Sequence, residues 1–392
     1  MDKYISIDKI VHTISKTHKF DKEKLYAINT SDVLEGEIIN APLMEVSELK
    51  GQFKKTIEKG DLLFSEIRPA NKRYAKVKIE DTKDYVVSTK LMVLRKYNDE
   101  VDFDYFYYCL TNEWFLNILQ KRAENRICSF PQITFDLLSE YKFRIPQLSE
   151  QKRIAETLSL LDQKIALNTR INAELEAMAK QLYDYWFVQF DFPDENGNPY
   201  KSSGGKMVYN STLKREIPAG WEVSQIVDIL DRVESTPRLT TSEYLSQGKY
   251  PIIDQTTDIY FAGFTNREEA ILYQYPAIVF GDHSCAVKYI NYPFARGADG
   301  TQIVLSKNKN VSIEYLYFYI MGINIGKGYA RHFGFVKDYP LIIPSKSSAM
   351  LFKNSAEKLF TKMMQLRLEI IQLIHLRDSL LPMLMNGQVT VE

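Results

Sequence analysis

Residues 154–186 read IAETLSLLDQKIALNTRINAELEAMAKQLYDYW, a stretch in which apolar side chains recur alternately four and three positions apart. A repeat of 3.5 residues keeps one apolar stripe on one side of a helix, which is typical of a coiled coil. Two polar residues, Asn168 and Asn172, interrupt the stripe, and polar residues at such positions commonly fix the register of paired helices. The stretch therefore predicts one long helix that packs against a partner helix.

A second stretch repeats this pattern 198 residues later, the offset between Pro146 and Pro344 (344 − 146). Shifted by that offset, the first stripe becomes a second stripe that is apolar except at Arg377. The economical partner of each stripe is the other, so we expect an intramolecular helix pair; the alternative is two unrelated surface helices, each packed on its own domain. The predicted seam consists of Ile154, Leu158, Leu161, Ile165, Leu175, Leu182, Leu359, Met363, Leu366, Ile370, Leu373 and Leu380.

Composition sets the outer bounds of the interpretation. The chain has 392 residues, of which 45% are hydrophobic, enough for two or three packed domains. No apolar run approaches the roughly 18 residues that span a bilayer, and the N-terminus lacks the pattern of a signal peptide. The three cysteines have no CxxC spacing, which favours free thiols. We therefore expect a soluble, cytoplasmic protein.

Net charge bears on the possible partners. Fifty Lys and Arg residues balance fifty Asp and Glu residues, whereas a protein that binds nucleic acid unaided is usually basic, because neutralising phosphates supplies much of the affinity. If the chain binds DNA, its basic residues must act locally and partner subunits must supply part of the affinity.

The remaining sequence predicts two similar mixed domains. Short β-rich runs at 61–65, 85–89 and 91–94 precede a helical pattern at 103–121, and runs at 277–280, 302–305 and 314–319 follow the same order in the second half. Turn residues dominate the segment between the halves. The predicted order is a mixed domain at 1–146, a long helix at 147–190, a linker at 191–215, a mixed domain at 216–344 and a long helix at 345–387.

Motifs of catalysis are missing from the sequence. Gly322–Gly328 has the wrong spacing for a phosphate-binding loop, and there is no G-x-S-x-G or H-E-x-x-H. On a strand, Asp282–Cys285 would alternate between faces and could not converge as a triad. His283 and Cys285 could share a face as metal ligands but have no second pair nearby, so a turn or loop is the simpler interpretation. We expect no catalysis and no metal site in this chain.

Acidic pairs keep one enzymatic alternative open. Asp61 with Glu66, and Asp254 with Asp258, could form a carboxylate site of a nuclease, although neither pair has a diagnostic spacing.

Candidate DNA contacts are basic, amide and aromatic residues that gather at corresponding loops of both halves. Lys and Arg neutralise phosphates, and Arg, Lys, Asn and Gln also read base edges. For any single residue, a solvated surface position is an equally simple interpretation. The candidates are Arg68, Lys72, Arg73, Tyr74, Arg122, Arg126, Arg238, Lys288, Arg296, Gln302, Lys327, Arg331, His332 and Lys337.

Three segments carry a resemblance to a known family. They are IPQLSEQKRIA at 145–155, LYDYWF at 182–187 and Gly220-Trp221 after the linker. In these segments, and in its organisation from end to end, the chain resembles the specificity subunit of Type I restriction-modification systems. The central region is quite specific, and the two mixed domains are similar only in a general way.

The resemblance implies an α+β fold in which two target recognition domains are separated by two long helices that form an antiparallel coiled coil. It implies that each domain reads one half of a bipartite, asymmetric site in double-stranded DNA. The helices would set the half-site spacing and dock two modification (methyltransferase) subunits. S-adenosylmethionine, ATP and Mg would be bound by those subunits and by restriction (translocase and endonuclease) subunits, not by this chain. The alternative is a stand-alone DNA-binding or regulatory protein derived from such a subunit.

Two features of the helices bear on this role. A helix from Ile154 to Trp186 would be roughly 48 Å long at 1.5 Å per residue, against about 34 Å for one turn of B-DNA. Pro382 stands where the first stretch has Asp184. Because proline removes a backbone donor, we expect the second helix to kink or end there.

Overall fold

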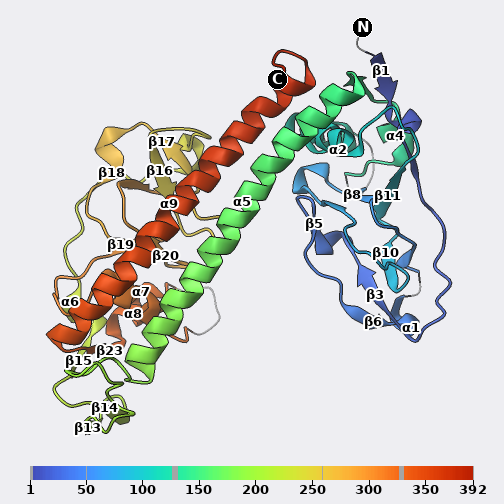
Figure 1. Cartoon of the computed structure of the whole chain (residues 1–392). Helices are drawn as coiled ribbons and strands as arrows, with labels where there is room; N and C mark the ends of the chain where they lie inside the picture. The colour runs from blue at the N-terminus through green and yellow to red at the C-terminus, as the bar shows by residue number, and fades with distance from the viewer. Residues whose placement is uncertain (1–2, 50, 126–130, 258, 326–330, 392) are drawn as a thin grey trace. The chain divides into compact units, whose positions relative to one another are not determined.

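The computed structural model describes residues 3–49, 51–125, 131–257, 259–325 and 331–391. Two long helices run through it (Figure 1): α5 (Leu148–Tyr183), which continues as a π-helical turn at Asp184–Val188, and α9 (Lys346–Met385). The chain divides into two compact units, Met1–Ala166 with Ile371–Glu392 and Leu167–Ile370. Each unit therefore contains one part of α5 and one part of α9. Both predicted long helices are confirmed.

Pro382 lies inside α9 and does not end it. Asn386 N donates to Pro382 O at 3.0 Å, so the backbone closes one further turn around the proline. The helix ends at Met385, and Gly387 has a φ of +70°, a conformation that glycine adopts easily after a helix. Of the kink or end expected at Pro382, the end lies instead at Met385, about one turn later.

The first domain, from β1 to β12 of unit 1, contains two four-stranded sheets. Their strand orders are β2-β11-β8-β9 and β6-β3-β10-β7, and a separate antiparallel pair, β1 with β12, joins the two ends of the domain. The strands are β1 (Lys3–Ser6), β2 (Val11–Thr13), β3 (Lys24–Ile28), β4 (Val33–Leu34), β5 (Glu37–Ile38), β6 (Leu43–Glu45), β7 (Phe53–Lys55), β8 (Leu62–Ser65), β9 (Tyr74–Lys76), β10 (Tyr85–Ser88), β11 (Leu91–Lys96) and β12 (Lys142–Ile145).

Helices cover one face of the β8-containing sheet. Alternate strand residues explain this arrangement, because Leu62 and Phe64 face the helical core, whereas Leu63 faces the core shared with the other sheet. The helix predicted at 103–121 is broken at Asn112, whose Oδ1 accepts Phe115 N at 2.8 Å and caps a new helix. The helices are α1 (Val46–Leu49), α2 (Phe103–Thr111), α3 (Glu113–Glu124) and α4 (Phe135–Ser139), with 3-10 turns η1 (Ile7–Lys9), η2 (Thr30–Asp32) and η3 (Pro69–Asn71).

The second domain, from β15 to β23 of unit 2, is preceded by a hairpin of β13 (Met207–Asn210) and β14 (Arg215–Pro218). Residues 191–215, expected to be a linker, thus contain β13. The domain comprises β15 (Glu222–Gln225), α6 (Ile226–Ile229), η5 (Thr241–Glu243), β16 (Tyr250–Ile253), β17 (Gly263–Thr265), η6 (Glu268–Ala270), β18 (Ile271–Leu272), β19 (Ala277–Gly281), β20 (Val287–Ile290), β21 (Phe294–Arg296), β22 (Thr301–Val304), α7 (Ile313–Met321), α8 (Phe333–Asp338) and β23 (Pro340–Ile343).

The two domains share one topology. The sheet β17-β16-β21-β18 repeats β6-β3-β10-β7, including the parallel pair at its centre, and β20-β19-β22 repeats β9-β8-β11. The pair β15 with β23 repeats β1 with β12. Helices α7 and α8 follow in the places of α2 and α4. The predicted duplication of a mixed domain and a long helix is confirmed.

The helix halves pair within each unit. In unit 1, Ile154 and Leu158 of α5 share a core with Leu381 and Leu384 of α9. In unit 2, Asn172 Nδ2 donates to Met363 O at 2.9 Å. Because positions early in α5 meet positions late in α9, the helices are antiparallel.

Burial varies along the predicted seam. Ile154, Leu158, Met363 and Leu366 are buried, and the other eight members are partly buried. Phe352 and Ala356 of the second stripe belong to the core of the second domain, together with Phe360 of α9, which the sequence reasoning missed.

A tyrosine, a carboxylate and an arginine link each domain to its helix halves. In unit 1, Asp162 of α5 accepts Tyr108 Oη at 2.7 Å and Arg377 Nη1 at 2.9 Å. In unit 2, Glu176 of α5 accepts Tyr317 Oη at 2.7 Å and lies 3.7 Å from Arg367 Nη2. The polar residue that broke the second stripe, Arg377, thus binds the carboxylate that links Tyr108 of the domain to α5.

Candidate nucleic-acid interface

In the first domain, loops from distant parts of the sequence meet at Glu66, the residue after β8. We define the first loop cluster as residues 66–73, 89–90 and 131–133. Glu66 N donates to Lys90 O at 3.0 Å, and Glu66 O accepts Ile133 N at 2.7 Å. The Glu66 carboxylate accepts Gln132 Nε2 at 2.8 Å. This residue therefore holds three segments together at one edge of the sheet.

Basic residues lie on this cluster in constrained backbone conformations. Arg68 and Lys72 have φ values of +45° and +52°, in the left-handed region that residues other than glycine rarely adopt. Such backbone strain concentrates at functional loops. Arg73 Nη1 donates to Ser31 O and Val33 O, each at 3.2 Å. Arg68 is exposed, whereas Arg73 ties the cluster to the loop that follows β3.

The second domain builds an equivalent arrangement around Asp282, the residue after β19. We define the second loop cluster as residues 254–257, 282–286, 298–300 and 331–333. Asp282 N donates to Gly300 O at 2.6 Å, and Asp282 O accepts His332 N at 2.9 Å, which repeats both backbone bonds of Glu66. The Asp282 carboxylate accepts Phe333 N at 2.9 Å and lies 3.4 Å from Gln302 Nε2.

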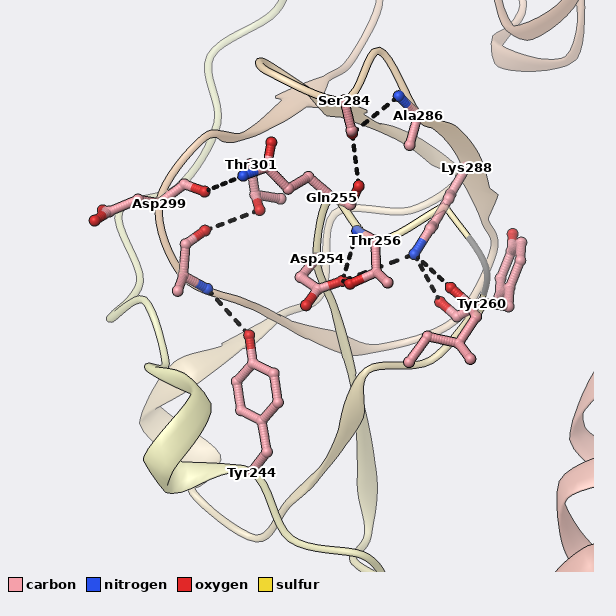
Figure 2. Close-up of polar contacts among 12 residues, drawn as sticks. Tyr244, Asp254, Gln255, Thr256, Tyr260, Ser284, Ala286, Lys288, Asp299 and Thr301 are labelled. Carbon is pink, nitrogen blue, oxygen red and sulfur yellow. Dashed lines mark hydrogen bonds and ion pairs between the residues drawn. The ribbon is translucent and has the colours of Figure 1, made fainter. Parts of the chain in front are cut away.

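Gln255 lies at the centre of the second loop cluster (Figure 2). Its side-chain Nε2 donates to Asp299 O at 3.0 Å, and its side-chain Oε1 accepts His283 N at 3.2 Å. Its backbone carbonyl accepts Ser284 Oγ at 2.6 Å. All polar groups of this side chain therefore bind other loops of the cluster, which fixes their conformation before any ligand arrives.

Glycines allow these loops to approach so closely. A Cβ on Gly281 would lie 2.8 Å from Gln255 Cβ, one on Gly297 would lie 2.7 Å from Asp254 Cβ, and one on Gly300 would lie 2.9 Å from Gln255 Nε2. Real Cβ atoms do not approach other atoms to these distances, so larger residues would force the loops apart. These three glycines are the sequence signal that could have identified the loop at 254–257, which the sequence reasoning did not select as a DNA contact.

Two arginines of the second domain lie near each other without an acidic partner among the contacts of the described residues. Burial and the neighbouring Arg238 both lower the pKa of Arg296. Arg296 Nε is buried without a hydrogen bond among the described residues. A partly buried guanidinium beside a like charge is costly unless an acceptor binds it. A phosphate would supply both a negative charge and acceptors to such a pair, and a guanine edge would supply acceptors.

The predicted DNA contacts occupy different environments. Arg68, Arg122, Arg238 and Arg331 are exposed; Lys72, Arg73, Arg296, Gln302 and Lys337 are partly buried; Tyr74, Lys288 and His332 are buried; and Arg126 and Lys327 lie outside the described residues. The exposed Arg122 pairs with Glu140 at 3.0 Å. Tyr74 packs in the core against the Tyr107 ring of α2, and Lys288 Nζ donates to backbone carbonyls.

The acidic pairs have structural roles where they are described. Arg95 Nε and Nη2 bind the two carboxylate oxygens of Asp61, each at 2.8 Å, in a bidentate ion pair. Glu66 and Asp254 bind loops, and Asp258 lies outside the described residues. Asp282–Cys285 forms a turn between β19 and β20, which confirms the simpler interpretation of this segment. Among the described residues, no three His, Cys, Asp or Glu side chains gather as metal ligands.

Comparison with known proteins identifies the family. Residues 5–177 and 218–349 match the family model of the Type I restriction modification DNA specificity domain. The chain belongs to this family. It is 40% identical over 190 residues to the Type I restriction enzyme HindI specificity subunit of Haemophilus influenzae, covering 48% of this chain and 41% of that protein.

Two further members extend the comparison. The chain is 27% identical over 318 residues to the Type I restriction enzyme MjaIX specificity subunit of Methanocaldococcus jannaschii, covering 75% of this chain and 71% of that one. The crystal structure of the S subunit of a Type I restriction-modification system from M. genitalium has the same fold, with a TM-score of 0.55 at 17% identity over 98% of this chain and 96% of that one. Among the described residues, no helix has the length and hydropathy to cross a bilayer.

Proposed function

We propose that this chain is the DNA-reading subunit of a Type I restriction-modification complex. Each domain reads one half of a bipartite, asymmetric DNA site with its own loop cluster, and the helix pair sets the distance between the halves. The observation that supports this proposal most strongly is the repetition of the loop cluster around Glu66 and Asp282. Two loop clusters of the same architecture, built from different amino-acid sequences, suit a DNA site with two different halves.

The cluster residues suit the grooves and phosphates of DNA. Arg68 in the first cluster and Arg331 in the second are exposed and flank the acidic residues that hold the loops. Arginine binds guanine O6 and N7 with two parallel hydrogen bonds, which distinguishes bases, whereas lysine mainly neutralises phosphates. Because the chain has no net charge, we infer that partner subunits contribute much of the phosphate binding.

The helices have apolar side chains available for partners. Leu160 and Met178 of α5 are 58% and 56% exposed, and Met350 of α9 is 56% exposed. Single exposed apolar residues are ordinary on protein surfaces, so these side chains are compatible with a docked partner without locating its site. We propose that two modification subunits dock on these helices and bind S-adenosylmethionine. Restriction subunits that bind ATP and Mg complete the complex.

The alternative function is a stand-alone DNA-binding or regulatory protein. It would have to bind DNA without partner subunits, which the balanced charge disfavours. The proposed subunit role and this alternative predict different behaviour of the purified chain. A regulator binds its site alone, whereas the proposed subunit gains high affinity only with a modification subunit.

Single-molecule methylation mapping tests the proposal. DNA would be sequenced from cells that express the chain with the modification subunit of the same genome, and from cells that lack only the chain. We expect a split motif with adenine methylated in both halves, present only with the chain. Exchange of residues 1–146 for those of a relative should change one half of the motif and leave the other intact. An expressed modification subunit that yields no chain-dependent motif would contradict the proposal.

A further inference from the structure

Each domain contains a lysine whose side chain is largely buried and contacts its loop cluster. Lys55 on β7 has a side chain that is 15% exposed, and Lys288 on β20 has one that is 6% exposed. Lysine is almost never buried unless its ammonium group is paired, because removing the charge from water is costly. The binding partners of these two ammonium groups therefore indicate what the buried lysine does in each domain.

The Lys288 ammonium group binds the loop that carries Gln255 (Figure 2). Nζ donates to Ile259 O at 2.8 Å and to Tyr260 O at 3.3 Å, and it lies 3.9 Å from Asp254 Oδ1. The same Asp254 oxygen accepts Thr256 N at 2.9 Å and Thr256 Oγ1 at 2.6 Å. Lys288 thus contacts this loop on both sides of Gln255.

The Lys55 ammonium group makes an equivalent set of contacts in the first domain. Nζ donates to Thr89 O at 3.0 Å and to Leu91 O at 2.7 Å, on either side of Lys90. It lies 4.0 Å from Glu66 Oε1, the carboxylate that holds the first loop cluster. Each lysine therefore has two carbonyls and one cluster carboxylate around its three donors.

These lysines are not copies of each other under the duplication. Lys55 lies on β7, whose counterpart is β18, whereas Lys288 lies on β20, whose counterpart is β9. The same contacts are thus built from two different strands. A similar solution at unrelated positions indicates that the contacts themselves, rather than inheritance of one residue, are required.

We propose that Lys55 and Lys288 are positioning residues for DNA specificity, each of which fixes the loop cluster of its own domain and controls the reading of one half-site. This inference rests on the proposed function. Neither lysine contacts DNA; each holds the backbone from which other side chains reach the bases. Burial lowers the pKa of both ammonium groups, that of Lys288 to about 8, so holding the loops costs stability.

Methylation mapping of two variants, K55M and K288M, tests the inference. Methionine preserves much of the side-chain length but has no donors, so the loops lose their fixed geometry while the core remains filled. We expect K288M to admit wrong bases in one half of the motif, with roughly a tenfold or larger rise in off-motif methylation, the discrimination of about one bidentate base contact. K55M should do the same in the other half only. Each variant is the control for the other.

The outcomes separate the two proposals. A wild-type complex without a split motif would contradict the proposed function itself. If the wild-type motif is present and both variants keep it unchanged, or lose methylation equally at every site, then the lysines serve stability alone and the positioning role is wrong. Relaxation of the same half by both variants would also contradict it.

Two further variants keep the test decisive if a methionine variant fails to fold. D254N keeps an acceptor for Thr256 but removes the negative charge beside Lys288. E66Q keeps an acceptor for Gln132 but removes the negative charge beside Lys55. We expect D254N to relax the half that K288M addresses and E66Q to relax the other half. Folding of each variant would be verified from its melting temperature, and unchanged motifs in both amide variants would overturn the inference.

Discussion

Replacing Asn168 with leucine should stabilise the second unit. Asn168 is 0% exposed, and neither its Nδ2 nor its Oδ1 has a hydrogen bond among the described residues. A buried amide without partners costs about 1–3 kcal/mol relative to its hydrated state in the unfolded chain. Leucine removes this penalty and adds apolar contact in the seam, so we expect a gain of about 1–3 kcal/mol after allowing for its larger volume.

Asn172 provides the matched control on the same helix face. It is 7% exposed, and its Nδ2 donates to Met363 O at 2.9 Å. Leucine at this position loses a satisfied hydrogen bond worth about 0.5–1.5 kcal/mol, which offsets the apolar gain. The two asparagines, one turn apart, should therefore respond to the same substitution with different signs or clearly different magnitudes.

Urea denaturation followed by far-ultraviolet circular dichroism measures the difference. Because the chain has two units, we compare transition midpoints at an unchanged slope rather than a single free energy of unfolding. The N168L midpoint should rise and the N172L midpoint should stay level or fall. N168L should also keep the wild-type spacing between methylated half-sites, because Asn172 still fixes the register. A midpoint that falls equally in both variants would refute the reasoning and show that the Asn168 amide is satisfied in solution.

Three other perturbations test separate parts of the structure. L175D places a charge in the partly buried seam of α5 and should cost roughly 2–4 kcal/mol; unchanged melting and assembly would contradict the paired helices. The pKa of Lys288 falls from 10.5 to about 8 on folding, so between these pH values the unfolded chain binds one proton more than the folded chain. Stability should therefore rise with pH in this range. Denaturation of K288M at several pH values should not show this rise. R331A should weaken binding at one half-site by about 1–3 kcal/mol if Arg331 reads a guanine; a uniform loss with a smaller salt dependence would identify a phosphate contact.

The long helices and the apolar strands β8, β10, β11, β19 and β22 could be predicted because their signals are local. The stripe from Ile154 to Trp186 repeats over a sufficient length to specify a helix, and β8 and β19 are short apolar runs bounded by turn residues. The break at Asn112 was missed because the apolar spacing continues through it. The extended backbone of Asn112, with a ψ of 147°, and its capping bond to Phe115 N separate the two helices.

The loop clusters could not be predicted in the same way, because their contacts join segments far apart in the sequence. Lys288 and Arg331 look alike in the sequence as basic residues near turns, yet one is buried below Gln255 and the other is exposed. The direction of a strand side chain decides this, and alternation alone does not say which face is covered. The close glycines Gly281 and Gly300 were the available signal, since each is needed only where another backbone or side chain approaches.

The links between domains and helices indicate how freely the domains can be exchanged. Under the 198-residue offset, Asp162 corresponds to Phe360 and Arg377 to Ala179, so the link in unit 1 has no counterpart at the equivalent positions of the helices. Both units nevertheless place the carboxylate on α5 and the arginine on α9. A domain moved from the first position to the second would bring Tyr108 against helix residues that lack this carboxylate. Domains should therefore exchange between related chains at the same position more readily than between the two positions of one chain.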